Sequence, residues 1–369
     1  FSDIGSKSVP KISFGWQVDD SFYFRGSWSK GFRVPNLVQV NETIVSRQIF
    51  GVDALLCLQQ INNNGEIDYC DYSFQRVARG SKNLRPEEST NISLGIIYEP
   101  KNIDNLVFTI DWWEIEKEDT IGLFGEDNIL LSDLVLRMET NNISDCSLVQ
   151  SNPYVFRDSL EENEIQEYLQ AGICPAGRVT RVEEQYRNLD TRIISGFDFS
   201  ARYFVNSDYG NFNFIVNISK LEKFRQKAGN DFIELIDAQE KGIIPEELAI
   251  TGFSDLIEKD GSPKIQANFK FLWNRGSWGL GLFGRHIGEF YETRNKLSDG
   301  RLWKVKAYNT INTFIDYNFK ISGSQSNLRF GINNIADERA PLASDIFGYY
   351  IDKHDNLGRS YYINFIHRY

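Results

Sequence analysis

The stretch KIQANFKFLWNRGSWGLGLF, residues 264–283, alternates between two kinds of side chain. Its apolar positions are Ile265, Ala267, Phe269, Phe271 and Trp273, then Trp278, Leu280 and Leu282. Polar or small residues stand between them, among them Lys264, Asn268 and Gly281. Because successive side chains of a β-strand point to opposite faces, this spacing predicts two antiparallel strands joined at 274–276. Each strand has one apolar and one polar face.

The same period of two recurs along the whole chain and predicts eleven strands. They cover approximately residues 11–18, 21–28, 91–98, 106–112, 192–203, 212–219, 264–273, 278–285, 305–319, 328–332 and 361–369. We assign Phe214, Ile265, Phe269, Phe271, Leu280 and Phe365 to the apolar face. Asp198, Asn217, Lys264, Asn268 and Gly281 are assigned to the polar face. The predicted fold class is all-β and antiparallel.

Turn lengths alternate along this series. Short turns at 19–20, 101–105, 206–211, 274–276 and 322–327 alternate with long loops at 33–89, 119–185, 225–262, 292–303 and 337–357. A transmembrane β-barrel has this asymmetry, with short periplasmic turns and long external loops. Aromatic residues assigned to strand ends resemble the girdles at membrane interfaces; they are Trp16, Trp28, Tyr98, Trp112, Trp273, Trp278 and Tyr369. A soluble sandwich would share the alternation but not these two features.

Composition excludes other classes. The chain has 369 residues, with 51 Asp and Glu against 40 Lys and Arg and a formal net charge of −11. An acidic chain lacks the basic surface that neutralises phosphates, so no nucleic-acid partner is expected. Aromatic residues make up 14% of the chain, too many for a disordered segment. The mean hydropathy of −0.38 suits barrel strands, in which only every second residue is apolar.

The sequence contains no evident catalytic set. Its three histidines, His286, His354 and His367, lie in different predicted elements, and neither Gly-x-Ser-x-Gly nor a phosphate-binding loop occurs. Cys-x-x-Cys is also absent, so a zinc site is not expected. We therefore predict no catalytic residue, no cofactor, no metal and no enzyme activity. An outer-membrane protease or lipase is the minor alternative.

Four cysteines fall in two pairs, and each pair lies inside one long predicted loop. An even count in loops favours two disulfides formed in an oxidising compartment, although four free thiols in a cytosolic protein are the alternative. Four cysteines permit three pairings. We predict Cys57–Cys70 and Cys146–Cys174, because each bond then closes within one external loop.

The strand count indicates a partial barrel. Eleven is odd, whereas bacterial single-chain barrels have an even number of strands. If the last strand runs toward the periplasm, the first does too, and its start would lie outside the cell. We therefore expect residues 1–369 to form the C-terminal half of a larger barrel.

Five segments resemble elements of TonB-dependent outer-membrane receptors. They are Ser27-Trp28-Ser29-Lys30-Gly31-Phe32-Arg33-Val34-Pro35-Asn36-Leu37, Asn83-Leu84-Arg85-Pro86-Glu87-Glu88-Ser89, Asp111-Trp112-Trp113-Glu114-Ile115, Gly331-Ile332-Asn333-Asn334-Ile335-Ala336-Asp337 and Gly358-Arg359-Ser360-Tyr361-Tyr362. Each is weak alone, but together they follow the family's order across almost the whole chain. His367 departs from the family's pattern. It is the third residue from the end of the chain, a position at which the barrel-assembly signal usually has an apolar residue.

The resemblance implies a 22-stranded barrel, of which this chain would supply strands 12 to 22, in the outer membrane of a Gram-negative bacterium. It implies TonB-energised uptake of a scarce, bulky nutrient: a siderophore, cobalamin, glycan or peptide. The partners implied are the TonB complex, outer-membrane lipid, the barrel-assembly machinery and the ligand. The family's plug domain and first strands are not in this sequence. A passive porin-like barrel or a surface-binding barrel is the alternative.

Four arginines on the predicted lumen face are candidate ligand-binding residues: Arg25, Arg192, Arg202 and Arg285. A guanidinium suits carboxylate and phosphate groups, which it binds with two hydrogen bonds. Alternatively, these side chains bond the plug or one another in a wet lumen.

The long loops contain two predicted helices. Ser159-Leu160-Glu161-Glu162 has the pattern of a capping box, and the helix would run to about Ala171, with Gly172 as its stop. A second helix is predicted over 127–138. Loops that carry helices and disulfides suit a ligand-covering lid better than an open pore. Shielding of the protein against proteases is the alternative role for these loops.

Overall fold

The computed structural model describes residues 7–41, 44–67, 69–297, 300–344 and 347–368. Within them, one antiparallel sheet follows the order β1-β2-β5-β6-β11-β12-β14-β15-β18-β19-β20. These strands are Lys11–Gln17, Phe22–Arg33, Glu87–Tyr98, Leu106–Glu118, Arg192–Ser207, Gly210–Gln226, Ile265–Arg275, Trp278–Ile287, Tyr308–Ile321, Ser324–Asn333 and Ser360–His367. The short strand β13 (Ser254–Asp255) adds to β12. The eleven predicted strands are confirmed, although the last was expected to reach Tyr369, outside the described residues.

The cross-strand registers confirm the predicted faces. Phe214 stands opposite Phe271, and Leu280 stands opposite Trp273. Asn217 stands opposite Asn268 on the other face. All six predicted apolar positions share one face, and four of the five predicted polar positions share the other; the fifth, Lys264, immediately precedes β14. Apolar side chains on the first face remain solvent-exposed, which suits contact with lipid.

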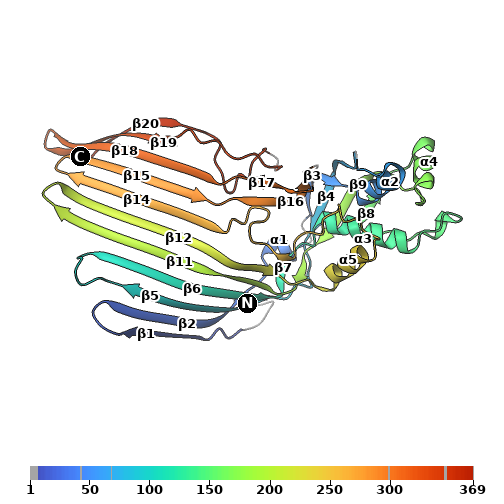
Figure 1. Ribbon diagram of the computed structural model, residues 1–369, viewed down its shortest axis with the longest axis horizontal. Coiled ribbons are helices and arrows are strands. Elements are labelled where there is room, and N and C mark those ends of the chain that lie inside the picture. The colour runs from blue at the N-terminus through green and yellow to red at the C-terminus, as the bar shows by residue number, and fades with distance from the viewer. Residues whose placement is uncertain (1–6, 42–43, 68, 298–299, 345–346, 369) are drawn as a thin grey trace.

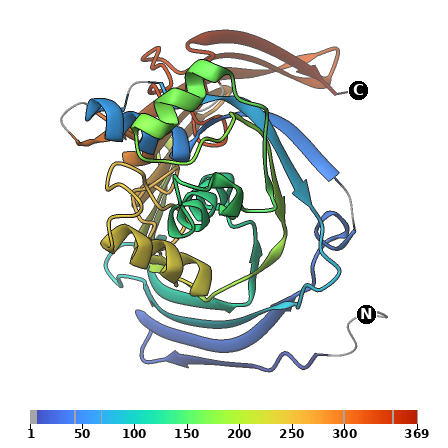
Figure 2. The same cartoon turned by 90° about the vertical axis from the view of Figure 1, so that its right-hand side faces the viewer.

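The sheet is a curved, open arc (Figure 2). Its short turns lie at one end, whereas the helices and small sheets lie at the other (Figure 1). Strands β11 and β12, for example, are separated by two residues, while β6 and β11 are separated by residues 119–191. The predicted alternation of short and long connections is confirmed.

Two details differ from the sequence prediction. Residues 305–319 do not form one strand, because β18 begins at Tyr308 and the segment before it, β17 (Leu302–Val305), pairs with β16 (Phe290–Lys296). Trp28 and Trp112 lie inside β2 and β6 and not at strand ends. In both cases the alternation itself continues, so the period alone does not place the boundary.

The three longest loops, residues 34–86, 119–191 and 227–264, fold together into one unit that we call the cap. A four-stranded sheet of order β3-β4-β9-β8 joins the first two loops, with β4 and β9 parallel. The cap strands are β3 (Ile44–Val52), β4 (Asp71–Arg79), β7 (Thr120–Gly122), β8 (Val155–Arg157), β9 (Val179–Gln185) and β10 (Arg187–Leu189). Its helices are α1 (Leu37–Val40), α2 (Ala54–Asn64), α3 (Glu126–Glu139), η1 (Cys146–Leu148), α4 (Glu162–Gln170) and α5 (Asn230–Glu240).

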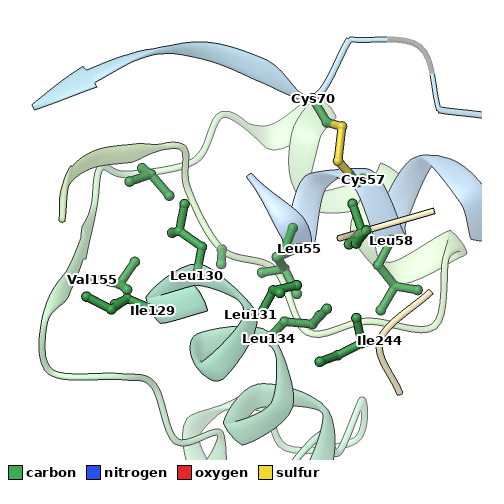
Figure 3. Packing of buried hydrophobic residues seen from close by; sticks show 14 of the residues in the cluster. Leu55, Cys57, Leu58, Cys70, Ile129, Leu130, Leu131, Leu134, Val155 and Ile244 are labelled. Carbon is green, nitrogen blue, oxygen red and sulfur yellow. A yellow bond between two sulfur atoms is a disulfide. The ribbon is translucent and has the colours of Figure 1, made fainter. Parts of the chain in front are cut away.

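The cap has its own apolar core. Leu55 of α2 and Leu130 and Leu134 of α3 are almost fully buried and lie close together (Figure 3). Phe232 and Leu235 of α5 belong to the same cluster, so all three loops contribute to it. Burying a side chain of this size contributes roughly 1.5–3 kcal/mol. The cap is therefore a folded unit and not a set of separate loops.

One predicted helix is confirmed closely and the other with a different cap. The helix expected over 127–138 is α3. Helix α4 begins later than predicted, because Glu161 is its N-cap and forms a capping box with Glu164, whereas Ser159 does not cap it. Gly172 follows the last turn with a φ of 75°, as the predicted stop requires.

The structure contains both predicted disulfides. Cys57–Cys70 joins α2 to the start of β4, and Cys146–Cys174 joins η1 to the segment after α4. Each bond lies within one loop of the cap.

Replacing both Cys57 and Cys70 with alanine should lower the free energy of unfolding of the cap by roughly 3 kcal/mol, the chain-entropy value for a loop of this length. Denaturant unfolding of the intact protein, monitored by limited proteolysis, measures the free energy of unfolding of the cap. Non-reducing peptide mapping of the unmodified protein is the control. A Cys70–Cys146 peptide, or unchanged stability, would contradict the prediction.

Candidate ligand-binding surface

The polar face of the sheet is its concave face. Glu87, on this face of β5, accepts a hydrogen bond from the backbone N–H of Ile121 in the cap at 2.8 Å. The cap lies at the loop end of the sheet (Figure 1), and in the end-on view it is framed by the arc (Figure 2). Farther along, Asn217 donates to Asn268 at 2.9 Å. A concave polar surface beneath a folded cap suits a hydrated passage.

Arg25 lies on this face and is already paired. Its Nε and Nη2 donate to the two carboxylate oxygens of Asp111 at 2.9 and 2.6 Å. The register of β2, β5 and β6 places Gly95 between them, which leaves room for the contact. This geometry supports the alternative role for Arg25, in which the side chain bonds another residue of the lumen face and not a ligand. Both carboxylate oxygens of Asp111 accept hydrogen bonds from it.

Arg192, the first residue of β11, is also engaged. Its Nε donates to Gln226 Oε1 at 2.9 Å, and its guanidinium lies 5.8 Å from the Phe224 ring centroid. It is half-buried. It holds two strands together close to the cap.

Arg202 and Arg285 have exposed guanidinium groups without a hydrogen bond or ion pair among the described residues. Arg202 lies on β11 near the short turn at 208–209, whereas Arg285 lies on β15 near its cap-side end. The strands β12 and β14 separate them. The four candidate arginines thus share a face but do not form one cluster.

Arg285 lines a cavity of about 290 Å³. Its walls include Tyr308, Thr310, Asn312 and Ser360, and the loop 334–359 closes one side through Asp355 and Leu357. A guanidinium beside amide and hydroxyl groups can bind an anionic oxygen group.

A second cavity, of about 380 Å³, lies in the cap and was not foreseen from the sequence. Asn83, Glu184 and Asp231, one from each cap loop, contribute to its wall. The Arg187 guanidinium on this wall pairs with Asp231 and lies 4.3 Å from the Phe124 ring centroid. No sequence signal brings these residues together, because they belong to three separate loops.

A buried ion cluster joins two loops of the cap. Arg157 donates two hydrogen bonds to Asp53, at 2.8 and 2.9 Å, and lies 3.2 Å from Asp133. Tyr72 donates a further hydrogen bond to Asp53 at 2.7 Å. Burial opposes ionisation of Asp53, but the Arg157 charge and these hydrogen bonds outweigh it and hold the pKa of this carboxyl below its usual value.

The structure brings the family-like segments into contact. Arg33 of the first segment and Glu87 of the second are cross-strand partners, and Arg33 Nε donates to Glu87 at 2.5 Å. Asp337 of the fourth accepts a hydrogen bond from the backbone N–H of Arg359 in the fifth at 2.7 Å. These contacts bring segments that are distant in sequence together in the fold.

Two features are absent from the described residues. No group of three or more His, Cys, Asp or Glu side chains is placed to hold a metal ion. Over the same residues, no helix combines the length and apolarity needed to cross a membrane.

An antiparallel sheet that is apolar outside, polar inside and joined alternately by short turns and long loops has the architecture of an outer-membrane β-barrel. Residues 1–335 match the family model described as TonB dependent receptor-like, beta-barrel, and the chain belongs to this family.

Solved structures share the fold at low sequence identity. The siderophore receptor PirA from Acinetobacter baumannii is 18% identical with a TM-score of 0.55, and the match covers 99% of this chain and 41% of that one. A mutant ferric enterobactin receptor, PfeA, from Pseudomonas aeruginosa is 14% identical with a TM-score of 0.55, over 99% and 40%. The chain thus spans about two fifths of the length of these structures. No curated protein sequence matches it.

Proposed function

We propose that residues 1–369 form the C-terminal half of the barrel domain of an outer-membrane receptor that imports a scarce, bulky nutrient. The TonB complex, acting on a plug domain outside this sequence, would supply the energy. Outer-membrane lipid would contact the apolar face, and the barrel-assembly machinery would insert the protein. The ligand would enter from the cap side.

The observation that carries this proposal is the folded cap. Three loops share one core, two disulfides and a buried ion cluster, so the cap places an ordered surface at one end of the concave face. A passive pore needs no such surface, because solutes cross it without being bound. Ligand selection before transport does need one.

Ferric siderophores are the ligands to test first, because the structural neighbours include receptors for a siderophore and for ferric enterobactin. Cobalamin, glycans and peptides follow. In a bacterium that carries the intact gene, ligand uptake should stop when this gene or TonB is deleted. Uptake that continues without TonB would support a passive barrel, and binding without uptake would support a surface-binding protein.

Among the four candidate arginines, we propose Arg285 as the one that contacts the ligand, because it has no ion-pair partner within the described ranges and lines a cavity near the cap. Arg285→Gln in the intact receptor should weaken binding of an anionic ligand by about 10- to 100-fold, the range for a hydrogen bond to a charged group. Equilibrium binding to purified receptor measures this.

Arg202→Gln is the matched control for Arg285→Gln. Arg202 is also exposed and unpaired on the same face, but it lies near the short turns, so its loss should leave initial binding unchanged. Equal effects of the two substitutions, or none from either, would exclude the proposed role of Arg285.

A further inference from the structure

His354 lies in the loop 334–359 and is buried among aromatic rings. Its side chain is 4% exposed. The ring stacks on Phe290 of β16 at a centroid distance of 6.1 Å and meets Tyr308 of β18 edge-on at 5.3 Å. Both neighbours are themselves buried. The imidazole therefore fills a gap between two elements that belong to different sheets.

Neither ring nitrogen of His354 has a hydrogen-bond partner among the described residues. Leaving such a group buried without a partner opposes folding, and burying it as a cation opposes folding much more. The contact is therefore favourable only while the ring is neutral and acts as an aromatic side chain.

The charged groups around His354 do not offset a positive charge. Arg285 from β15 and Lys353 from the same loop are cations that disfavour protonation. On β16 and its flank, Glu289 pairs with Lys304, and Glu292 accepts hydrogen bonds from Ser344. The carboxylate of Asp355 accepts a hydrogen bond from the backbone N–H of Leu357.

The segment Tyr350–Leu357 also closes the Arg285 cavity. The Tyr308 hydroxyl donates to the backbone oxygen of Asp355 at 2.6 Å, and Tyr308, Asp355 and Leu357 all line that cavity. Displacing His354 from between Phe290 and Tyr308 would move this wall.

We propose that His354 is a pH-sensitive switch that keeps the segment Tyr350–Leu357 over the Arg285 cavity while its ring is neutral, and that protonation releases the segment. The proposal rests on the proposed function only in placing this loop toward the external medium. There the loop meets the pH of the surroundings directly. The regulated property is access to the Arg285 cavity.

The segment Tyr350–Leu357 has two states: closed, with His354 buried between Phe290 and Tyr308, and open, with His354 in water. The pKa of His354 in each state determines how pH shifts the equilibrium between them. In the closed state, burial, with Arg285 and Lys353, lowers the pKa of His354 to about 4. In the open state the pKa returns to about 6.5. The closed state is therefore fully favoured above pH 6.5 and loses stability as the pH falls from 6.5 toward 4. At pH 5 the segment should open about 30-fold more often than at pH 7.5.

Hydrogen–deuterium exchange of the intact receptor tests this, with protection factors corrected for the intrinsic pH dependence of exchange. Amides of Tyr350–Leu357 should lose about 30-fold in protection between pH 7.5 and 5, while those of β15 keep theirs. His354→Phe should abolish the change, since phenylalanine keeps the ring contacts but cannot be protonated. His354→Leu provides a second non-titrating variant if the larger ring does not fit.

His286→Gln is the control, because His286 lies on β15 with a hydrogen-bonding contact to Asn309 at 2.7 Å. The wild-type pH response should persist in it. Equal protection at both pH values in the wild type, or a response that survives in both His354 variants, would overturn the proposal. The exchange measurement involves neither ligand nor TonB, so failure of uptake would reject the proposed function without affecting this result.

Discussion

Replacing Arg157 with methionine should destabilise the cap by about 3–5 kcal/mol, the range expected when a buried ion pair loses one partner. Asp53 and Asp133 are both fully buried, and Arg157 contacts both of them. Without the guanidinium, the buried Asp53 carboxylate would lose its cation and keep hydrogen bonds from the Tyr72 hydroxyl and the Leu55 backbone N–H. Asp133 would keep its ion pair with Arg137. Because the cluster joins residues 34–86 to residues 119–191, its loss should weaken the contact between the two loops, which the pairing of β4 with β9 and the apolar core still join.

Limited proteolysis of the intact receptor across a denaturant series measures the stability of the cap in this variant. Arg85→Met is the matched control, since Arg85 pairs with Asp119 on the cap surface and its side chain is 71% exposed. Exposed pairs contribute little, so this change should leave the cap intact. Similar midpoints for the two variants would show that the buried cluster is not what stabilises the cap.

Phe269→Arg should make folding into a bilayer less favourable by about 2–4 kcal/mol, because it places a charge on the lipid-facing side near the middle of β14. Phe269 is 39% exposed on the apolar face and stands opposite Val216. Its removal also takes away an apolar contact with lipid. Refolding titration of the intact protein into lipid vesicles measures the change.

Asn268→Arg is the control for Phe269→Arg, since it introduces the same charge one residue away but on the polar face. It removes the hydrogen bond from Asn217, a neutral contact worth about 1 kcal/mol. The arginine can reach water there, so the loss should be much smaller. If the two arginines destabilised the protein equally, the assignment of the two faces would be wrong.

The sheet could be predicted because its information is local. In β14 and β15 every second side chain is apolar, and the period alone assigns each residue to a face. The short turn between these strands then sets their register. The period does not determine where a strand begins. Alternation starts at Val305, but the large sheet includes the chain only from Tyr308 onward, because Val305 belongs to β17, which pairs with β16.

The cap was recognised only in part. Helix α3 and both disulfides were predicted, since helical spacing and cysteine position lie within one loop. The sheet β3-β4-β9-β8 was not, because its central pairing joins Gln75 to Arg181 across more than a hundred residues. Such pairing depends on which loops pack together, and a short stretch of sequence does not determine that.

The candidate site divides in the same way. Alternation alone determined that Arg25, Arg192, Arg202 and Arg285 face the interior, because side-chain direction in a strand follows residue parity. Only the tertiary structure decided which of them are paired. Arg25 contacts Asp111 through the register of three strands, whereas Arg285 contacts no carboxylate in the part of the chain that the structure describes. Direction is a local property of the backbone, but a partner, a cavity or a buried charge depends on residues that only the folded chain brings within contact distance.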